Sequence, residues 1–205
     1  MGNMQSASSM RLYDERNQRL YINAAERARF IKAAERAAPE ISTFGLTLLY
    51  TGCRISEALE LTAAAVQIEA GSVSIRCLKK RRKHIMREVP IPSALADLLD
   101  AVHGIRASQQ RLTAEAVPLW RHGGQPVNRS TAYRWIKDLM RDAGIRGIHA
   151  SPKGLRHGYG IHAIRSGVPL NMLCKWMGHA SISTTAIYTN ALGPDEQEIA
   201  ARMWD

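Results

Sequence analysis

The spacing of apolar residues divides the chain into helical segments and one short stretch of strands. From residue 23 to residue 61 the apolar positions recur every three or four residues, the period of a helix that buries one face. We expect a first helix that begins at Asn23, has Glu26 in the reciprocal capping position and stops at Pro39. A second helix should end at Gly52, and a third should restart at about Ile55.

The period changes to two after residue 71. Val73, Ile75 and Cys77 alternate with polar residues, which is typical of a strand with one buried face. The basic turn LKKRRKH covers residues 78–84, and a second strand contains Val89 and Ile91. This stretch therefore predicts one small antiparallel hairpin.

Helical periodicity returns in the rest of the chain. A helix follows the hairpin, and a loop-rich segment covers residues 103–127. Ser130 is expected to cap the next helix, which Gly144 ends. After Lys153 the pattern predicts three further helices, with Gly167 between the first and second and Gly178 between the second and third. The expected fold class is mainly α with a small antiparallel β-hairpin or sheet (α+β).

The charge balance changes this picture of an ordinary globular protein. The chain has 28 Lys and Arg against 18 Asp and Glu, a formal net charge of +10 and a pI of about 9.9. Such a balance serves solubility in some proteins, but more often it indicates a polyanionic partner such as nucleic acid.

The cysteines and the apolar runs indicate the compartment. Cys53, Cys77 and Cys174 are widely spaced in apolar surroundings, which favours core thiols in a reducing compartment over a disulfide framework or a zinc site. No apolar run has the length of a membrane span, and the N-terminus lacks a signal-peptide core. We expect a cytoplasmic protein that associates with the nucleoid and not with a membrane.

One segment, residues 152–190, concentrates the candidate chemistry. It contains Lys153, Arg156, His157, His179 and Tyr188. Each residue type has an ordinary structural explanation: arginines bridge helix ends, a histidine after glycine caps a helix, and a lone tyrosine usually packs in a core. Together they suit chemistry on a phosphate, because cations hold it, an imidazole hydrogen-bonds it and a hydroxyl attacks it.

The basic turn adds a further cluster of positive charge. It contains Lys79, Lys80, Arg81, Arg82 and Lys83. A solvated hairpin tip is the usual explanation for a run of charge. Five like charges on a short hairpin repel one another, however, and an anionic partner explains them better.

Two motifs resemble those of the tyrosine recombinases, or phage-type integrases. TGCRISEALEL (residues 51–61) is similar to the first-arginine motif, and LRHGYGIHAIRSGVPLNMLCKWMGHASISTTAIYTN (residues 155–190) is similar to the second-arginine, histidine and tyrosine motifs. The resemblance covers about residues 21–192 and implies the catalytic-domain fold of that family. It implies that Arg54 and Arg156 are the catalytic arginines, that His179 belongs to the GH motif and that Tyr188 is the nucleophile.

The hairpin resembles the family hairpin that carries a catalytic lysine. Lys79 is the first choice for that role, with Lys80 a near rival because the strand register is open. Residues 80–83 and His157 are expected to contact DNA. The family usually has histidine three residues before the second arginine, and here that position is Lys153, which is expected to support the same phosphate.

The resemblance also divides the chain. Residues 1–20 are expected to be a mobile tail, residues 21–192 the catalytic domain, and residues 193–205 a C-terminal segment. That last segment either docks on a neighbouring protomer or folds back on its own domain. Typical members have a helical domain before the first motif, so the chain resembles a catalytic domain alone, either natural or truncated.

The activity implied is site-specific DNA recombination through a 3′-phosphotyrosyl intermediate. It needs neither a metal nor a cofactor, acts on double-stranded DNA and implies a homo-oligomer assembled on that DNA. Two other hypotheses stay open: a DNA-binding accessory protein with weak or no strand transfer, and a relaxing enzyme similar to type IB topoisomerases. Whether Tyr188 acts in its own site or in a partner's is also open.

Overall fold

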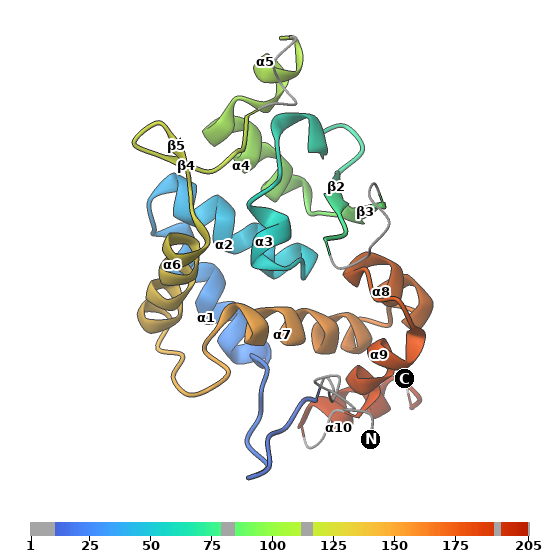
Figure 1. The fold of residues 1–205 in the computed structure, drawn as a ribbon. Coiled ribbons are helices and arrows are strands. Elements are labelled where there is room, and N and C mark those ends of the chain that lie inside the picture. The colour runs from blue at the N-terminus through green and yellow to red at the C-terminus, as the bar shows by residue number, and fades with distance from the viewer. Residues whose placement is uncertain (1–10, 79–84, 112–116, 191–193, 205) are drawn as a thin grey trace, which may run out of the picture.

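The structure is a computed structural model, and it describes residues 11–78, 85–111, 117–190 and 194–204. Helices make up most of it, and a small sheet lies along one side (Figure 1). Helix α2 (Pro39–Thr51) packs against α1 (Ala24–Glu35), α4 (Ser93–His103), α6 (Arg129–Asp142) and α7 (Pro152–Arg165). The expected fold class, mainly α with small antiparallel sheets, is confirmed.

The first helix and the third begin where the sequence predicts, whereas α1 ends at Glu35, before the expected stop at Pro39, which is the first residue of α2. The Asn23 side chain accepts a hydrogen bond from the Glu26 backbone, and the Glu26 side chain accepts one from the Asn23 backbone, so the capping box is confirmed. Helix α2 ends at Gly52, which has a left-handed backbone with φ 59°. The chain turns there, and α3 (Ile55–Ala58) begins after its N-cap residue Arg54.

The predicted hairpin is the larger part of a three-stranded antiparallel sheet. Strands β2 (Ser72–Arg76) and β3 (Met86–Pro90) pair with Val73 opposite Val89. A short strand β1 (Val66–Gln67), which follows the 3-10 helix η1 (Ala63–Ala65), adds a third strand beside β2. The sequence analysis missed β1, because two residues are too few to show a period. Residues 79–84 of the basic turn lie outside the described residues.

Between the long helices α4 and α6 the described part of the chain contains only short elements. They are α5 (Ile105–Gln109) and the two-residue strands β4 (Arg121–His122) and β5 (Gln125–Pro126). Helix α6 is capped by Asn128, whose side chain accepts a hydrogen bond from the Thr131 backbone N–H at 2.8 Å. The expectation that Ser130 caps this helix was wrong, because the helix begins one residue before it.

The C-terminal part runs through α8 (Leu170–Met177), α9 (Ile182–Ala186), the 3-10 helix η2 (Ile187–Thr189) and α10 (Pro194–Ala201). In this structure α10 lies against α7 of its own chain. Arg202 donates a hydrogen bond to the backbone oxygen of Ile164 at 3.3 Å. No helix among the described residues has the length and apolar character needed to cross a membrane.

Two apolar clusters hold these elements together. The larger lies around α2, the sheet and α6, with Phe44, Val73 and Ile136 fully buried. The smaller joins the N-terminal segment to α7, α8 and η2, and its buried members are Leu12, Tyr21, Ile161, Ala163, Leu173, Met177 and Tyr188. The candidate nucleophile is therefore part of a core.

Candidate active site

Arg54 lies at the first turn after α2, where the left-handed Gly52 redirects the chain. Its guanidinium pairs with the carboxylate of Glu57 at 2.8 Å, and its backbone N–H donates to the same carboxylate at 2.9 Å. The Arg54 side chain is 26% exposed, so solvent or a ligand reaches one side of it. The first motif thus presents a fixed arginine at the surface.

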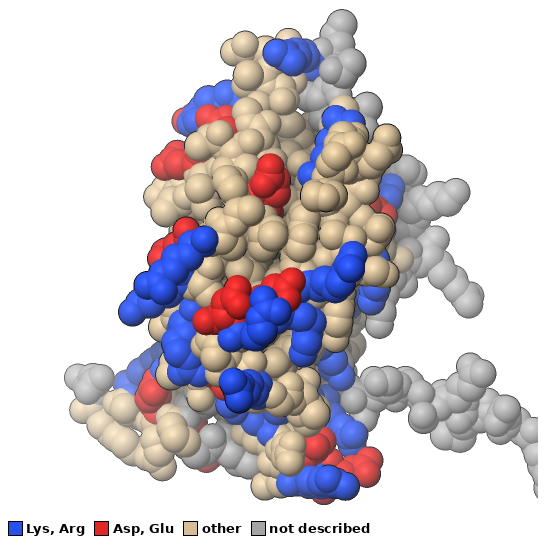
Figure 2. All heavy atoms as spheres, turned by 90° about the vertical axis from the view of Figure 1, so that its left-hand side faces the viewer, with Lys and Arg blue, Asp and Glu red and all other residues tan. Residues whose placement is uncertain are grey.

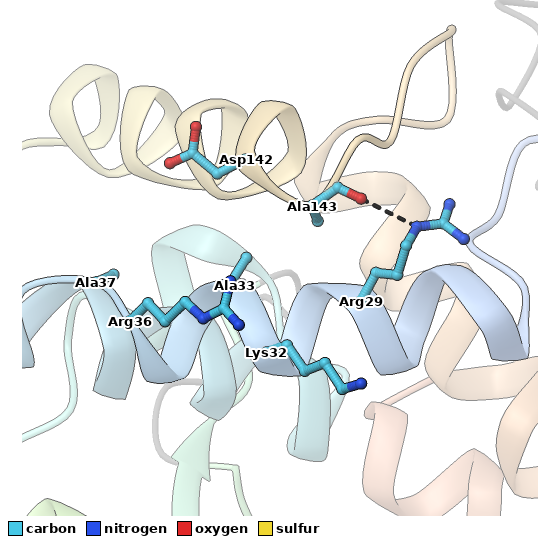
Figure 3. A pocket seen from close by; sticks show the side chains of 7 residues that line it. All are labelled: Arg29, Lys32, Ala33, Arg36, Ala37, Asp142 and Ala143. Atoms are coloured by element: carbon cyan, nitrogen blue, oxygen red, sulfur yellow. Dashed lines mark hydrogen bonds between the residues drawn. The ribbon is translucent and has the colours of Figure 1, made fainter.

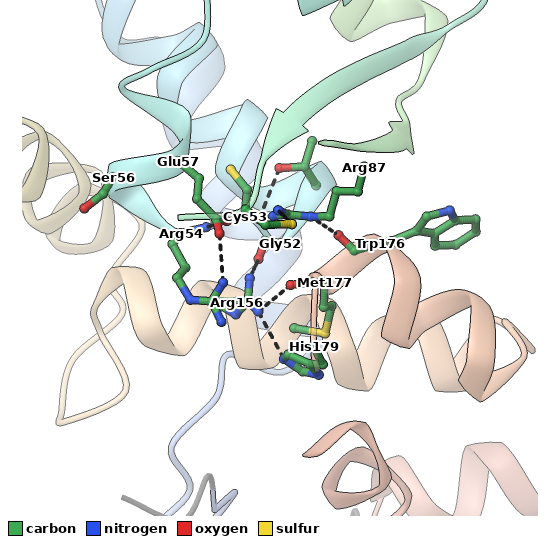
Figure 4. A network of polar contacts seen from close by, with 12 residues as sticks. Gly52, Cys53, Arg54, Ser56, Glu57, Arg87, Arg156, Trp176, Met177 and His179 are labelled. Carbon is green, nitrogen blue, oxygen red and sulfur yellow. Dashed lines mark hydrogen bonds and ion pairs between the residues drawn. The ribbon is translucent and has the colours of Figure 1, made fainter. Parts of the chain in front are cut away.

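Arg156 joins segments that are distant in the sequence. From α7, its Nη1 donates to the Gly52 backbone oxygen at 2.6 Å and its Nη2 to the Met177 backbone oxygen at 2.8 Å. Nη2 also lies 3.0 Å from Nε2 of His179 (Figure 4). Burial and the nearby charge of Arg54 lower the Arg156 pKa to about 10, which leaves the guanidinium charged at neutral pH. The Arg156 side chain therefore connects the first-arginine motif, through Gly52, to the histidine motif, through His179.

His179 follows Gly178, which ends α8 with φ 65°. Because arginine has no acceptor, Nε2 must accept the hydrogen bond from Arg156, and Nδ1–H then donates to Oγ1 of Thr185 at 2.8 Å. Burial, followed by the charge of Arg156, lowers the His179 pKa to about 3. The imidazole is therefore neutral, and two partners fix its orientation.

Tyr188 is completely buried in η2. Its ring lies against Gly160 of α7, where an added Cβ would come within 2.5 Å of the ring, and its ring centroid is 6.4 Å from that of His179. Burial raises the pKa of the Tyr188 hydroxyl well above its ordinary value. The candidate nucleophile is thus a neutral phenol beside the histidine and arginine motifs.

The other two candidates on α7 lie in different environments. Lys153 is exposed, one helical turn before Arg156, and its side chain has no hydrogen-bond partner in the described part of the chain. His157 is 1% exposed, and its Nδ1 lies 3.2 Å from the Tyr188 hydroxyl. It is therefore placed against the tyrosine and shielded from solvent. Lys79, Lys80, Arg81, Arg82 and Lys83 lie outside the described residues.

Comparison with known proteins adds to this geometry. The model of the phage integrase family matches residues 19–193, which is most of the chain. The chain belongs to the phage integrase family. It is 31% identical to the tyrosine recombinase XerD of Halalkalibacterium halodurans over 147 residues, which cover 71% of this chain and 48% of that protein. It is 30% identical to the tyrosine recombinase XerA of Pyrococcus furiosus over 156 residues, 76% of this chain and 52% of that protein.

Solved structures show the same fold. The crystal structure of XerA recombinase superposes with a TM-score of 0.76 at 25% identity and covers 90% of this chain and 65% of that chain. The XerH site-specific recombinase bound to difH substrate superposes with a TM-score of 0.70 at 20% identity, over 94% of this chain and 60% of that chain. The chain spans about half the length of the curated relatives it matches.

Two buried residues of this phage integrase domain were missed by the sequence analysis. Glu57 accepts from Arg54 on one side and from Nη2 of Arg87 at 2.6 Å on the other. Arg87 also donates to the Trp176 backbone oxygen at 2.7 Å and lies 3.2 Å from the Cys77 sulfur. The available signal was the strand period, which places Arg87 on the same face as the buried Val89. Figure 4 shows this network beside Arg156.

The Glu57 carboxyl is charged despite its burial. Burial alone would raise its pKa, but the charge and hydrogen bond of Arg87, with the contacts from Arg54, outweigh it and hold the pKa below its usual value. The network therefore fixes Arg54, the turn end of the β2–β3 hairpin and the end of α8 relative to one another. In this way it positions the hairpin strands beside the two arginines.

A basic groove lies elsewhere on the domain, between α1 and the end of α6. Arg29, Lys32 and Arg36 line it from α1, and Asp142 and Ala143 from α6, around a volume of about 430 Å³ (Figure 3). Figure 2 shows Lys and Arg spread with acidic residues over the face on which these helices lie. None of the motif residues lines this groove. Among the described residues no group of His, Cys, Asp and Glu could hold a metal ion.

Proposed function

We propose that this domain cleaves and rejoins DNA strands through a 3′-phosphotyrosyl intermediate, as a site-specific recombinase or integrase. The observation that carries the proposal is the Arg156 side chain, which contacts both Gly52 and His179. It brings the arginine and histidine motifs together next to Tyr188, although they are far apart in the sequence. The family membership and the resemblance of the motifs support the same activity.

The chemistry follows from the charges of these groups. The Tyr188 oxygen attacks the scissile phosphorus, and the DNA is released with a 5′-hydroxyl. Arg54 and Arg156 stabilise the charge that develops on the non-bridging oxygens, and His179 accepts a hydrogen bond from Arg156 and so holds that guanidinium in place. Each such donor contributes on the order of 2–4 kcal/mol in the transition state. Because one ester replaces another, rejoining needs no external energy source or cofactor.

The leaving 5′-oxygen needs a proton donor. We assign this role to Lys79, with Lys80 as the rival, because the family hairpin carries a catalytic lysine. Arg87 ties strand β3 to Glu57 and Trp176, so the strands that carry the basic turn are anchored beside the arginines. The exposed Lys153 is placed to support the phosphate from α7.

Double-stranded DNA is the proposed substrate. Residues 80–83 of the basic turn would bind backbone phosphates, and the net charge of +10 would attract the DNA as a whole. Binding of this kind should weaken steeply with salt. Among the similar structures, XerH was crystallised with its difH substrate and the lambda integrase as a dimer bound to a core site. By analogy this chain would assemble as a homo-oligomer on DNA, in the cytoplasm with the nucleoid.

A covalent-adduct assay tests the proposal. The protein is incubated with a pool of nicked duplexes from the native replicon, without divalent metal, and resolved on a denaturing gel. Wild-type protein should form a covalent DNA adduct and Tyr188→Phe should not. Tyr50→Phe, which removes a hydroxyl that makes no hydrogen bond among the described residues, is the matched control and should form it.

The other outcomes separate the alternatives. DNA binding without any adduct would favour the accessory protein. The complete burial of Tyr188 fits that hypothesis, because a buried hydroxyl does not reach a phosphate at the surface. An adduct formed equally on all sequences, with relaxation of supercoiled plasmid, would favour the topoisomerase-like enzyme. An adduct that persists in Tyr188→Phe would refute the assignment of the nucleophile.

A further inference from the structure

The Tyr188 hydroxyl has one hydrogen-bond partner among the described residues, Nδ1 of His157 at 3.2 Å. The two side chains come from α7 and η2, and their ring centroids are 5.9 Å apart. His157 is 1% exposed and Tyr188 is fully buried, so bulk water does not compete for this contact. A nucleophilic hydroxyl must lose its proton as it attacks, and His157 is the group in contact with that proton.

The direction of this hydrogen bond follows from counting the groups that lack a partner. His157 Nε2 is buried without a partner. If Tyr188 donates to Nδ1, only the Nε2–H donor stays unpaired. If Nδ1–H donates instead, both the Tyr188 O–H and the Nε2 lone pair are left unpaired. Since each buried unpaired polar group costs free energy, the tyrosine donates and the histidine accepts.

We propose that His157 is the general base that accepts the Tyr188 proton during attack on the scissile phosphate. This inference rests on the proposed function. Burial, with the nearby charges of Lys153 and Arg156, lowers the His157 pKa to about 4, so its lone pair is free at neutral pH. The family usually has a histidine at the position of Lys153, and a protonated lysine has no lone pair to accept a proton.

The neighbouring imidazole is less suited to this role. Nε2 of His179 accepts from Arg156, and its Nδ1–H is directed to Thr185, so both of its nitrogens are occupied. His157 is therefore hydrogen-bonded to the reacting oxygen of Tyr188, whereas His179 is hydrogen-bonded to Arg156, the arginine that would hold the phosphate. The two histidines thus have separate roles.

The proton and the bonds balance in the proposed step. The Oη–H bond of Tyr188 breaks and its proton moves to Nδ1 of His157, while Oη bonds to phosphorus. The bond from phosphorus to the 5′-oxygen breaks, and the hairpin lysine protonates that oxygen. On rejoining, the 5′-hydroxyl gives its proton to the hairpin lysine and its oxygen attacks the phosphorus, the bond from phosphorus to the Tyr188 oxygen breaks, and His157 returns its proton to the tyrosine. The positive charge that His157 gains equals the charge that the hairpin lysine loses when it protonates the 5′-oxygen.

The first test is the tautomer of His157 in the DNA-free protein. Nitrogen-15 NMR of the labelled chain, with His157→Asn to assign the signal, reports which ring nitrogen carries the proton. We expect Nε2–H, with Nδ1 unprotonated. A protonated Nδ1 would overturn the proposal, because His157 would then donate to the tyrosine. This test uses the wild-type fold and does not depend on catalysis.

The second test is kinetic. His157→Asn should slow adduct formation by about 10²–10⁴-fold, the usual contribution of a general base. His162→Asn is the matched control: it is a partly buried histidine on the same helix, its pKa is also lowered, and it should leave the rate unchanged. Thermal unfolding of both variants checks that they fold.

Changing the acidity of the nucleophile separates a base from a structural role. With 3,5-difluorotyrosine at position 188, the more acidic phenol needs less help, so the penalty of His157→Asn should shrink by about tenfold. An equal penalty with either tyrosine would overturn the proposal. If wild-type protein forms an adduct and His157→Asn matches it, this inference alone fails; if wild type forms none, the proposed function fails and this role with it.

Discussion

The buried Glu57 carboxylate gives the sharpest test of the network behind the two arginines. Its side chain is 0% exposed and that of its partner Arg87 is 4% exposed. Glu57→Gln keeps the shape of the side chain but removes its charge, which leaves the Arg87 guanidinium buried without a counterion. Removing one member of such a pair costs about 3–5 kcal/mol of unfolding free energy. For a domain of this size that corresponds to a fall of about 6–20 °C in Tm.

The assay is urea unfolding of wild type and Glu57→Gln at neutral pH, followed by circular dichroism. Glu60→Gln is the matched control, because Glu60 pairs with Arg76 and the two side chains are 39% and 52% exposed. An exposed pair of this kind contributes at most about 1 kcal/mol. Equal losses in the two variants would refute the reasoning, because burial would then make no difference to the strength of the pair.

A double variant separates the charge from the packing. In Glu57→Gln with Arg87→Met no fully buried charge is left unpaired, because Arg54, the other partner of Glu57, is 26% exposed; part of the lost stability should therefore return relative to Glu57→Gln alone. The single variant Arg87→Met completes the comparison. If the loss of unfolding free energy in the double variant equals the sum of the losses in Glu57→Gln and Arg87→Met, the two residues do not depend on one another, and the network does not fix the hairpin as described.

Three further predictions concern separate features of the domain. Gly160→Ala should lower the unfolding free energy by about 1–3 kcal/mol and reduce adduct formation, because its Cβ would meet the Tyr188 ring at 2.5 Å; an unchanged urea midpoint would contradict this packing. Glu26, with its pKa lowered to about 2, should stabilise the fold fully above pH 4.5 and lose this contribution as the pH falls toward 2. Glu26→Gln should therefore flatten the acid side of a plot of unfolding free energy against pH, and a plot with the wild-type slope would refute the assignment. Asn128→Ala should cost about 1 kcal/mol through the lost helix cap, whereas Ser130→Ala should stay within about 0.5 kcal/mol in the same urea assay.

The sequence by itself determined the local structure and the motifs. Helix starts and stops depend on neighbouring residues, such as the capping pair Asn23 and Glu26 or the glycine at position 52, so they could be predicted without a tertiary structure. The order and spacing of the arginine, histidine and tyrosine motifs likewise pointed to the family that the comparisons show. The choice of Asn128 over Ser130 as a cap could not be made, because both residue types cap helices equally well.

Tertiary structure alone decided which side chains meet and which are buried. The Glu57–Arg87 pair joins residues thirty positions apart, and its strength comes from the exclusion of water by segments that pack around it. Burial likewise places His157 on the Tyr188 hydroxyl, whereas the sequence suggested that it contacts DNA. A residue's type fixes which hydrogen bonds it can make, but the packing of distant segments decides which partner it finds and whether water competes.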